Sequence, residues 1–200
     1  MRRFPAIDEA IASTALALMT LIPLIEIALR PLHGKGIANA PLLVQHLGLA
    51  VAMFGAVLAE RGGHLSTLGS GLAGARSPWL HNAANLVAKG GAALFTGMLG
   101  AASWTFVTSE MEGGRELAYG IPVWAVQALM PAGFVILGIR LGAHCAPKRV
   151  AGLLTGLALT GMGFAFALHF DGTPLPLPPI ALGLVLVLLA GAPIFAILGG

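Results

Sequence analysis

The chain has 200 residues, of which 57% are hydrophobic and only 10% are charged. A soluble domain carries about 25% charged residues, so this composition excludes an ordinary soluble fold. The net charge of +3 requires no nucleic-acid partner, because Lys and Arg collect at the cytoplasmic rims of membrane proteins. Several apolar runs approach the ~20 residues that cross a hydrocarbon core, and they lack the alternation of a membrane barrel. The composition predicts an all-α integral membrane protein.

The chain opens with two predicted membrane helices. The first spans residues 7–29 and is retained, since no cleavage site with a polar mature region follows it. Glu26 and Arg30 are four residues apart and share a helix face, which predicts an ion pair at the outer rim. The second helix covers residues 41–59.

The stretch that follows predicts a corner at the membrane surface. The second helix ends at the charged residues Glu60 and Arg61. Two glycines and His64 follow, and then a segment with regularly spaced leucines. An amphipathic segment of this kind lies in the headgroup region. We therefore expect Glu60, Arg61 and His64 to form an interfacial, lipid-contacting corner on the cytoplasmic side.

The third predicted helix spans residues 79–108 and is too long for a perpendicular crossing. Tilt, or a first part lying in the interface, would absorb the excess length. Lys89 then reaches the interface by snorkelling or pairs with Glu60, and the functional alternative is a proton relay or a retinal Schiff base. A short acidic loop is expected next, holding Glu110, Glu112, Arg115 and Glu116.

The fourth predicted helix covers residues 121–141 and carries Pro131 and Gly133 in its middle. Proline there frees a carbonyl, and glycine lets a neighbouring helix approach closely. A connecting helix and a proline-rich loop are expected over residues 147–178, with a weak small-residue motif at Gly152 and Gly156. A last helix, residues 179–200, runs to the final residue.

The distribution of Lys and Arg predicts an N-terminus on the inside. With that orientation, seven basic residues lie on the inner side and three on the outer side. The inner residues are Arg2, Arg3, Arg61, Arg76, Arg140, Lys148 and Arg149, and the outer ones are Arg30, Lys35 and Arg115. Six crossings then return the C-terminal end to the cytoplasm.

No catalytic motif is present in the sequence. It holds no HExxH, GxSxG or glycine-rich phosphate loop, so we expect no enzyme activity, no cofactor and no metal site. The single Cys145 excludes an internal disulfide. The main alternative is a haem- or quinone-binding redox subunit, with a haem held by His81 and His144 near the inner face. Polar residues at helix ends explain the same histidines more simply.

Four blocks of the sequence resemble a known family, the small membrane subunit of tripartite ATP-independent periplasmic (TRAP) transporters, called the Q or DctQ-like subunit. These blocks are Phe54-Gly55-Ala56, Glu60-Arg61-Gly62-Gly63-His64-Leu65, Gly120-Ile121-Pro122-Val123-Trp124, and Met130-Pro131-Ala132-Gly133-Phe134 with Arg140. The resemblance assigns residues 1–146 to a four-helix Q-type unit. Residues 182–200 are similar to the opening helix of the large M subunit, as in fused Q–M proteins. That M-type portion stops after one helix, so the chain is either a fragment of a fused protein or has its M portion supplied separately.

One departure from the family pattern is visible. Members often carry an acidic pair at the start of the second helix, where this chain has Gln45 and His46. Any contact made by those acids is therefore in doubt here.

The resemblance implies a scaffold role in the bacterial inner membrane. In this family the M subunit moves organic acids by an elevator motion driven by a sodium gradient, and a periplasmic binding protein delivers the substrate. The Q subunit braces M and offers periplasmic surface to the binding protein. The expected partners are thus an M-type subunit, a periplasmic binding protein and lipid, and we expect no contact between sodium and this chain.

Overall fold

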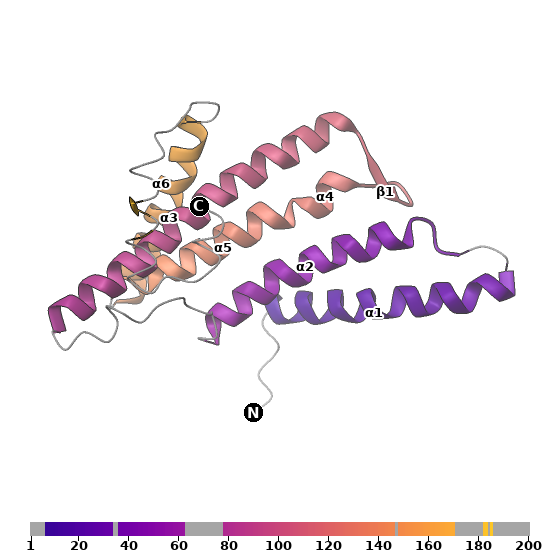
Figure 1. The fold of residues 1–200 in the computed structure, drawn as a ribbon, viewed down its shortest axis with the longest axis horizontal. Coiled ribbons are helices and arrows are strands. Elements are labelled where there is room, and N and C mark those ends of the chain that lie inside the picture. Colours follow the sequence, from indigo (N-terminus) through magenta and orange to yellow (C-terminus); the bar gives the residue numbers. More distant parts are fainter. Residues whose placement is uncertain are drawn as a thin grey trace. The chain divides into compact units, whose positions relative to one another are not determined.

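The computed structural model describes residues 7–33, 36–62, 78–146 and 148–170, together with residues 182, 183 and 185 (Figure 1). The described part is mostly helical, and five of its segments are long and apolar enough to cross a membrane. They are Ile7–Pro31, Ala40–Arg61, Leu86–Gly113, Val123–Ala143 and Arg149–His169. The predicted all-α membrane class is confirmed. The surface segment with His64, and most of the sixth predicted crossing, lie outside the described residues.

The elements follow one another along the chain as six helices and one small sheet within the described residues. The helices are α1 (Ile7–His33), α2 (Ala40–Arg61), α3 (Pro78–Gly113), α4 (Val123–Gln127), α5 (Leu129–Ala143) and α6 (Arg149–His169). The strands β1 (Glu116–Ala118) and β2 (Ile121–Pro122) pair in antiparallel fashion between α3 and α4.

Helix α3 is longer than the sequence predicts. The apolar run ends near residue 108, but the helix continues to Gly113, so Glu110 and Glu112 lie in its last turn and not in a loop. Glutamate and methionine are good helix formers, and nothing interrupts the helix before the two glycines. Gly114 then adopts a φ of 59°, the left-handed conformation that commonly ends helices.

The predicted fourth helix is divided into α4 and α5. Helix α4 ends at Gln127 and α5 begins at Leu129, so Pro131 lies in the first turn of α5 and not in the middle of a continuous helix. Proline has no N–H to donate, and this loss costs little in a first turn, where N–H groups lack helical partners anyway. Helical hydrogen bonds from Ala128 N to Trp124 O and from Ala132 N to Ala128 O run across this break, so Pro131 interrupts the single candidate span Val123–Ala143 near its middle.

The β1–β2 hairpin was not predicted. Its turn is formed by Tyr119 and Gly120, whose φ angles are 54° and 77°. Two consecutive positive φ angles are typical of the two-residue turn whose twist matches paired strands. Five strand residues are too few to show a period of two in the sequence.

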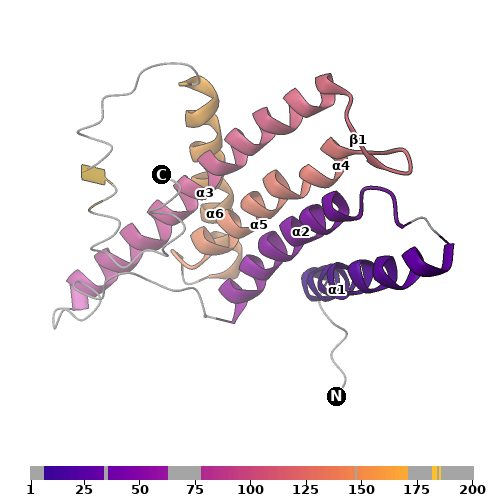
Figure 2. The ribbon, with the colours of Figure 1, turned by 45° about the vertical axis from the view of Figure 1, so that its right-hand side comes forward.

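The chain divides into two compact units. One holds Met1–Leu58 and Ser103–Gly133, and the other holds Ala59–Ala102 and Phe134–Gly200, so α2, α3 and α5 contribute residues to both. In the first unit, α1 runs beside the first part of α2 in Figures 1 and 2. Gly48 of α2 packs there against Met19 of α1.

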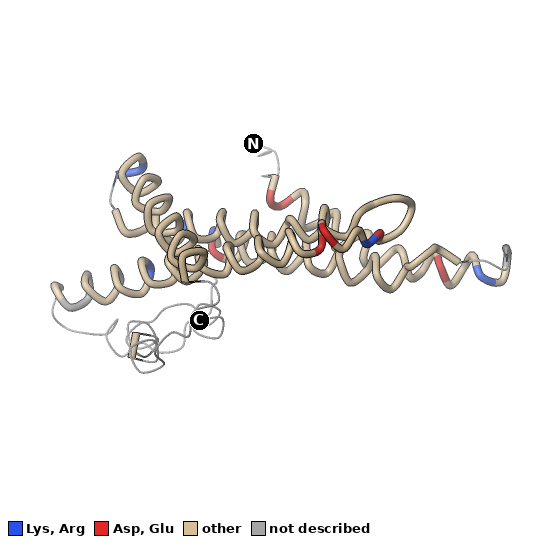
Figure 3. Tube along the Cα trace, turned by 90° about the horizontal axis from the view of Figure 1, so that it is seen from above, with Lys and Arg blue, Asp and Glu red and all other residues tan. Residues whose placement is uncertain are grey.

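The second unit has a core of small residues. Ala92 and Ala93 of α3 are fully buried, and the buried face of α6 consists of Gly152, Gly156, Thr160 and Gly163. Charged residues interrupt the helices at only a few places in Figure 3. Since lipid tails are as apolar as leucine, close packing of small residues is the force that holds membrane helices together.

Candidate functional site

The closest packing in the second unit lies where α6 meets α5 and α3. A Cβ atom added at Gly156 would overlap the carbonyl oxygen of Ile139, and one at Gly163 would overlap that of Leu94. The backbones therefore touch directly, with Cα–H groups against carbonyl oxygens. The small-residue motif at Gly152 and Gly156 lies in this contact.

Thr160 stands at the point where α3, α5 and α6 come together. The residue is only 3% exposed, and its hydroxyl has no hydrogen-bond partner among the described residues. A Cβ added at Gly138 of α5 would lie 2.7 Å from that hydroxyl oxygen, and one at Gly97 of α3 would overlap the Thr160 carbonyl. Two glycines on neighbouring helices thus make room for this one residue, and the contact fixes the three helices against one another.

The end of α2 is joined to the end of α5 by a polar contact. His144 Nδ1 lies 3.2 Å from Glu60 Oε1, with 5% of the Glu60 side chain exposed and 57% of the His144 side chain. Glu60 is therefore buried in the protein, whereas we expected it at a lipid-contacting corner. Arg61 is exposed.

Lys89 lies near this end of the second unit as well. We expected it to snorkel or to pair with Glu60, and the contact found at Glu60 is with His144. Lys89 is close enough to Cys145 for its positive charge to lower the pKa of that thiol, although burial has the larger effect and raises the pKa.

Two ion pairs mark helix ends in the first unit. Arg30 Nη2 lies 2.8 Å from Glu26 Oε1, one turn apart on α1. Arg115 contacts the buried Glu110 through two nitrogens, with Nε donating to Oε2 at 2.9 Å. This pairing raises the pKa of Arg115. It also fixes the chain at the point where it leaves α3 for β1.

The hairpin is tied to the start of α2. The side-chain amide of Asn39 donates to the carbonyl oxygen of Leu117 at 2.7 Å, and Asn39 itself has a φ of 53°. Tyr119 at the hairpin turn is 74% exposed. The hairpin is therefore held in place at its base while its aromatic tip remains accessible.

Gly133 packs against α2 in the first unit. A Cβ added there would lie 2.9 Å from the Cβ of Met53. Such a distance is shorter than real contacts allow, so only glycine fits without a shift of one helix. Pro131 lies two residues earlier in the same turn of α5.

Two of the described histidines have polar neighbours within the protein. His144 Nδ1 faces Glu60, and His46 Nδ1 lies 2.8 Å from the carbonyl oxygen of Leu42 in its own helix. The His81 and His64 side chains fall outside the description. No group of three or more His, Cys, Asp or Glu residues that could hold a metal ion occurs among the residues the structure describes.

Sequence reasoning missed three of these contacts. Glu60 and His144 are far apart in the chain, as are Asn39 and Leu117, and no local spacing links either pair. The burial of Thr160 depends on glycines in two other helices. The spacing of Gly152, Gly156 and Gly163 did carry a signal, because it places small residues on a single face of α6.

The family comparison agrees with the blocks that the sequence resembles. The model of the family described as "Tripartite ATP-independent periplasmic transporters, DctQ component" matches residues 19–149. No curated protein and no solved structure matches the chain significantly. The match covers well over half of the chain and includes α2, α3, the hairpin, α4 and α5. The chain therefore belongs to the DctQ component family of TRAP transporters and is a small transporter component of the inner membrane.

Proposed function

We propose that this chain is a non-catalytic brace for the large M-type subunit of a sodium-gradient-driven TRAP transporter for organic acids. It also contributes to the docking of the periplasmic binding protein. Residues 147–178 connect the Q-type unit, residues 1–146, to an M-type portion that begins at residue 179. The family match carries the general role of a small transporter component, and the packing described above supports the bracing role.

The contact of α6 with α3 and α5 is the observation that carries the bracing role. Glycines bring these backbones together, and Thr160 is locked between two of them. Close-packed interiors resist compression and transmit strain, so such a frame yields little when a neighbour moves. A subunit that stays still beside a moving partner needs this stiffness.

Two contacts fit the order of crossings in the predicted topology, and they would fit equally with the opposite orientation. The Asn39–Leu117 hydrogen bond joins segments that six crossings with an inner N-terminus would place on the periplasmic side. The Glu60–His144 contact joins helix ends that the same topology places on the cytoplasmic side. In this topology the hairpin faces the periplasm, where a binding protein would approach.

Transport in vesicles tests the bracing role. The large subunit and the loaded binding protein are reconstituted with this chain, without it, or with a variant carrying Gly156→Leu. We expect sodium-dependent uptake with the unaltered chain and a large loss in the other two cases. Gly161→Leu is the matched control, because a side chain at Gly161 meets open space. Full uptake by the large subunit alone would contradict the proposal.

A further inference from the structure

The start of α6 carries a basic pair that the described protein does not neutralise. Lys148 precedes the helix, Arg149 is its first residue, and both are exposed. Neither residue makes an ion pair with another residue that the structure describes. The described part of the second unit holds one acidic residue, Glu60, and its carboxyl group is buried beside His144. The basic pair therefore lacks an anionic partner in this part of the protein.

Other basic residues add positive charge to the same end of the second unit. Arg140 lies in the last turn of α5, and the charge of Lys89 on α3 acts on the thiol of Cys145. Cys145 belongs to the turn that leads to Lys148. At the other end α6 finishes at His169, and no Lys or Arg lies there among the described residues. The positive charge of α6 is thus concentrated at its start.

The face of α6 that follows the basic pair is exposed and apolar. Its first turns expose four branched side chains by 57–73%, those of Val150, Leu153, Leu154 and Leu157. Ala158 and Ala165 continue the same face and are also exposed. Since α6 is a candidate membrane span, this face would meet the hydrocarbon core and the basic pair would lie at the level of the headgroups.

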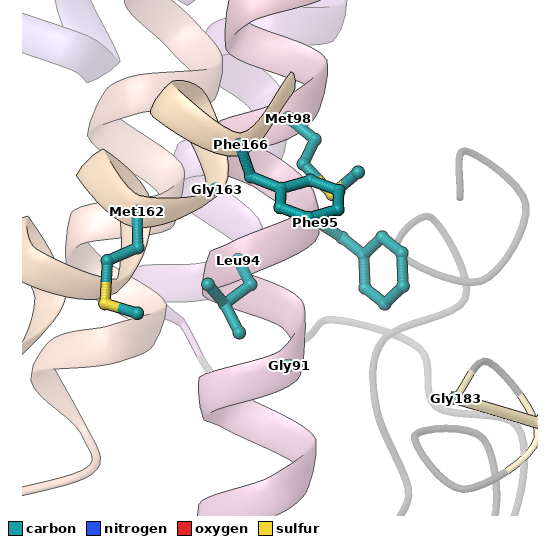
Figure 4. Close-up of a pocket in the computed structure, with 8 residues that line it drawn as sticks. All are labelled: Gly91, Leu94, Phe95, Met98, Met162, Gly163, Phe166 and Gly183. Carbon is teal, nitrogen blue, oxygen red and sulfur yellow. The ribbon is translucent and has the colours of Figure 1, made fainter. Parts of the chain in front are cut away.

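The apolar surface continues along α6 without any charge. Met162 and Phe166 extend from α6 beside α3 in Figure 4, where they line an apolar cavity of about 310 Å³. No charged side chain is among the residues that line this cavity. An anionic headgroup would therefore find partners at the start of α6 and none in this later part.

We propose that the start of α6 is a docking site for an anionic phospholipid. Its phosphate contacts Lys148 and Arg149, and one acyl chain lies along the exposed face that begins at Val150. Charge complementarity selects this occupant, because a guanidinium group can donate two parallel hydrogen bonds to a phosphate and an ammonium group adds a second cation. A zwitterionic lipid carries its own cation beside the phosphate and gains less from the pair. The bound lipid fixes the depth of α6 in the membrane.

Fluorescence quenching by brominated lipids tests this site. Ala158→Cys in a Cys145→Ser background carries the fluorophore, since Cys145 is the only cysteine in the chain. Residue 158 lies about 14 Å along the helix from Arg149, a depth that bromine atoms in the middle of an acyl chain reach. The labelled full chain is reconstituted with the large subunit in vesicles of brominated phosphatidylglycerol or brominated phosphatidylcholine. We expect phosphatidylglycerol to occupy the site at least several-fold more strongly.

Two matched controls separate a site from general attraction. Lys148→Gln combined with Arg149→Gln should abolish the preference for phosphatidylglycerol. Arg2→Gln combined with Arg3→Gln removes the same charge elsewhere in the chain and should keep the preference. A fluorophore at Ala165→Cys lies on the same face of α6 but near its uncharged end, so both lipids should quench it equally.

Each other result would overturn the proposal. Equal loss of the preference in both double variants would reduce it to an effect of net charge. Quenching by neither lipid at residue 158 would mean that the large subunit covers this face. Loss of the preference when inorganic phosphate is added at constant ionic strength would assign the basic pair to a free anion. None of these readouts depends on transport, so the bracing role is tested separately.

Discussion

Tyr119 occupies a conformation that a large aromatic residue rarely adopts. Its φ of 54° lies in the left-handed region, where glycine and asparagine are favoured, and the residue is 74% exposed. Such strain persists where the surroundings enforce it, and it commonly marks functional surfaces. The hairpin is held at its base by Asn39, so under the proposed topology its exposed tip would be available to the binding protein.

We therefore predict that Tyr119→Asn weakens the interaction with the binding protein without unfolding the hairpin. Asparagine accepts the same backbone conformation, so the change removes the ring alone. The KM of uptake for the loaded binding protein should rise several-fold while kcat changes little. Tyr119→Phe retains the ring and should behave like the unaltered protein. An unchanged KM in the asparagine variant would remove Tyr119 from the docking surface.

The Glu60–His144 contact leads to a prediction about stability. Removing His144 leaves the buried carboxyl group of Glu60 without this partner. Loss of a partner from a buried polar group costs about 1–3 kcal/mol of folding stability. Because His144 is more than half exposed, we expect a loss of about 1 kcal/mol. His144→Ala should lower the unfolding temperature of the purified protein. In Glu60→Gln protein the same histidine change should have a smaller effect, and equal effects in both backgrounds would exclude coupling between the two residues.

At the scale of the element, the glycine face of α6 makes the sharpest prediction. Gly156→Ala would place a methyl group against the Ile139 carbonyl and the Ala143 nitrogen, and overpacking of this kind costs about 1–3 kcal/mol. Gly161→Ala on the same helix meets open space and should stabilise the helix by up to about 1 kcal/mol. Thermal unfolding of the two variants in detergent should therefore shift in opposite directions. Similar shifts for both would mean that α6 does not pack as described.

The sequence predicted the long helices well, because each one needs an unbroken apolar run to cross the bilayer. It could not locate their ends, since α3 continues through charged residues after its apolar run stops. Lys89 and Glu110 are 21 positions apart on α3, which corresponds to a rise of about 31 Å. That length is close to the thickness of a hydrocarbon core, about 30 Å.

Other elements depend on information that a local pattern does not hold. The break between α4 and α5 depends on the position of Pro131 in the helix. The hairpin turn depends on two residues with positive φ angles. The contacts of the candidate site are tertiary, so Glu60 was expected at the lipid surface and is buried beside His144. The glycines of α6 were partly recognised because their spacing alone defines a helix face.

At the scale of the whole molecule, the single cysteine can report the orientation in the membrane. Cys145 lies just beyond the candidate span Val123–Ala143, and the orientation predicted from Lys and Arg would put it on the cytoplasmic side. A membrane-impermeant maleimide should therefore label Cys145 in inside-out vesicles and leave it unlabelled in intact spheroplasts. Gly113→Cys in a Cys145→Ser background should give the reverse pattern, since the proposed topology would place Gly113, at the end of α3, on the periplasmic side. Labelling of Cys145 from the outside would reverse the topology and with it the periplasmic placement of the hairpin.

The rate of that labelling should depend on pH in a defined direction. Only the thiolate reacts, and burial raises the pKa of Cys145, so the reaction should be slow at neutral pH and faster as the pH rises. The charge of Lys89 opposes this rise, so Lys89→Met should raise the pKa further and slow labelling at any given pH below it. Lys89→Arg keeps the charge and should preserve the rate. If the methionine variant reacted as fast as the unaltered chain, Lys89 would lie too far from Cys145 to act on it, and the arrangement of the α3 and α5 ends would need revision.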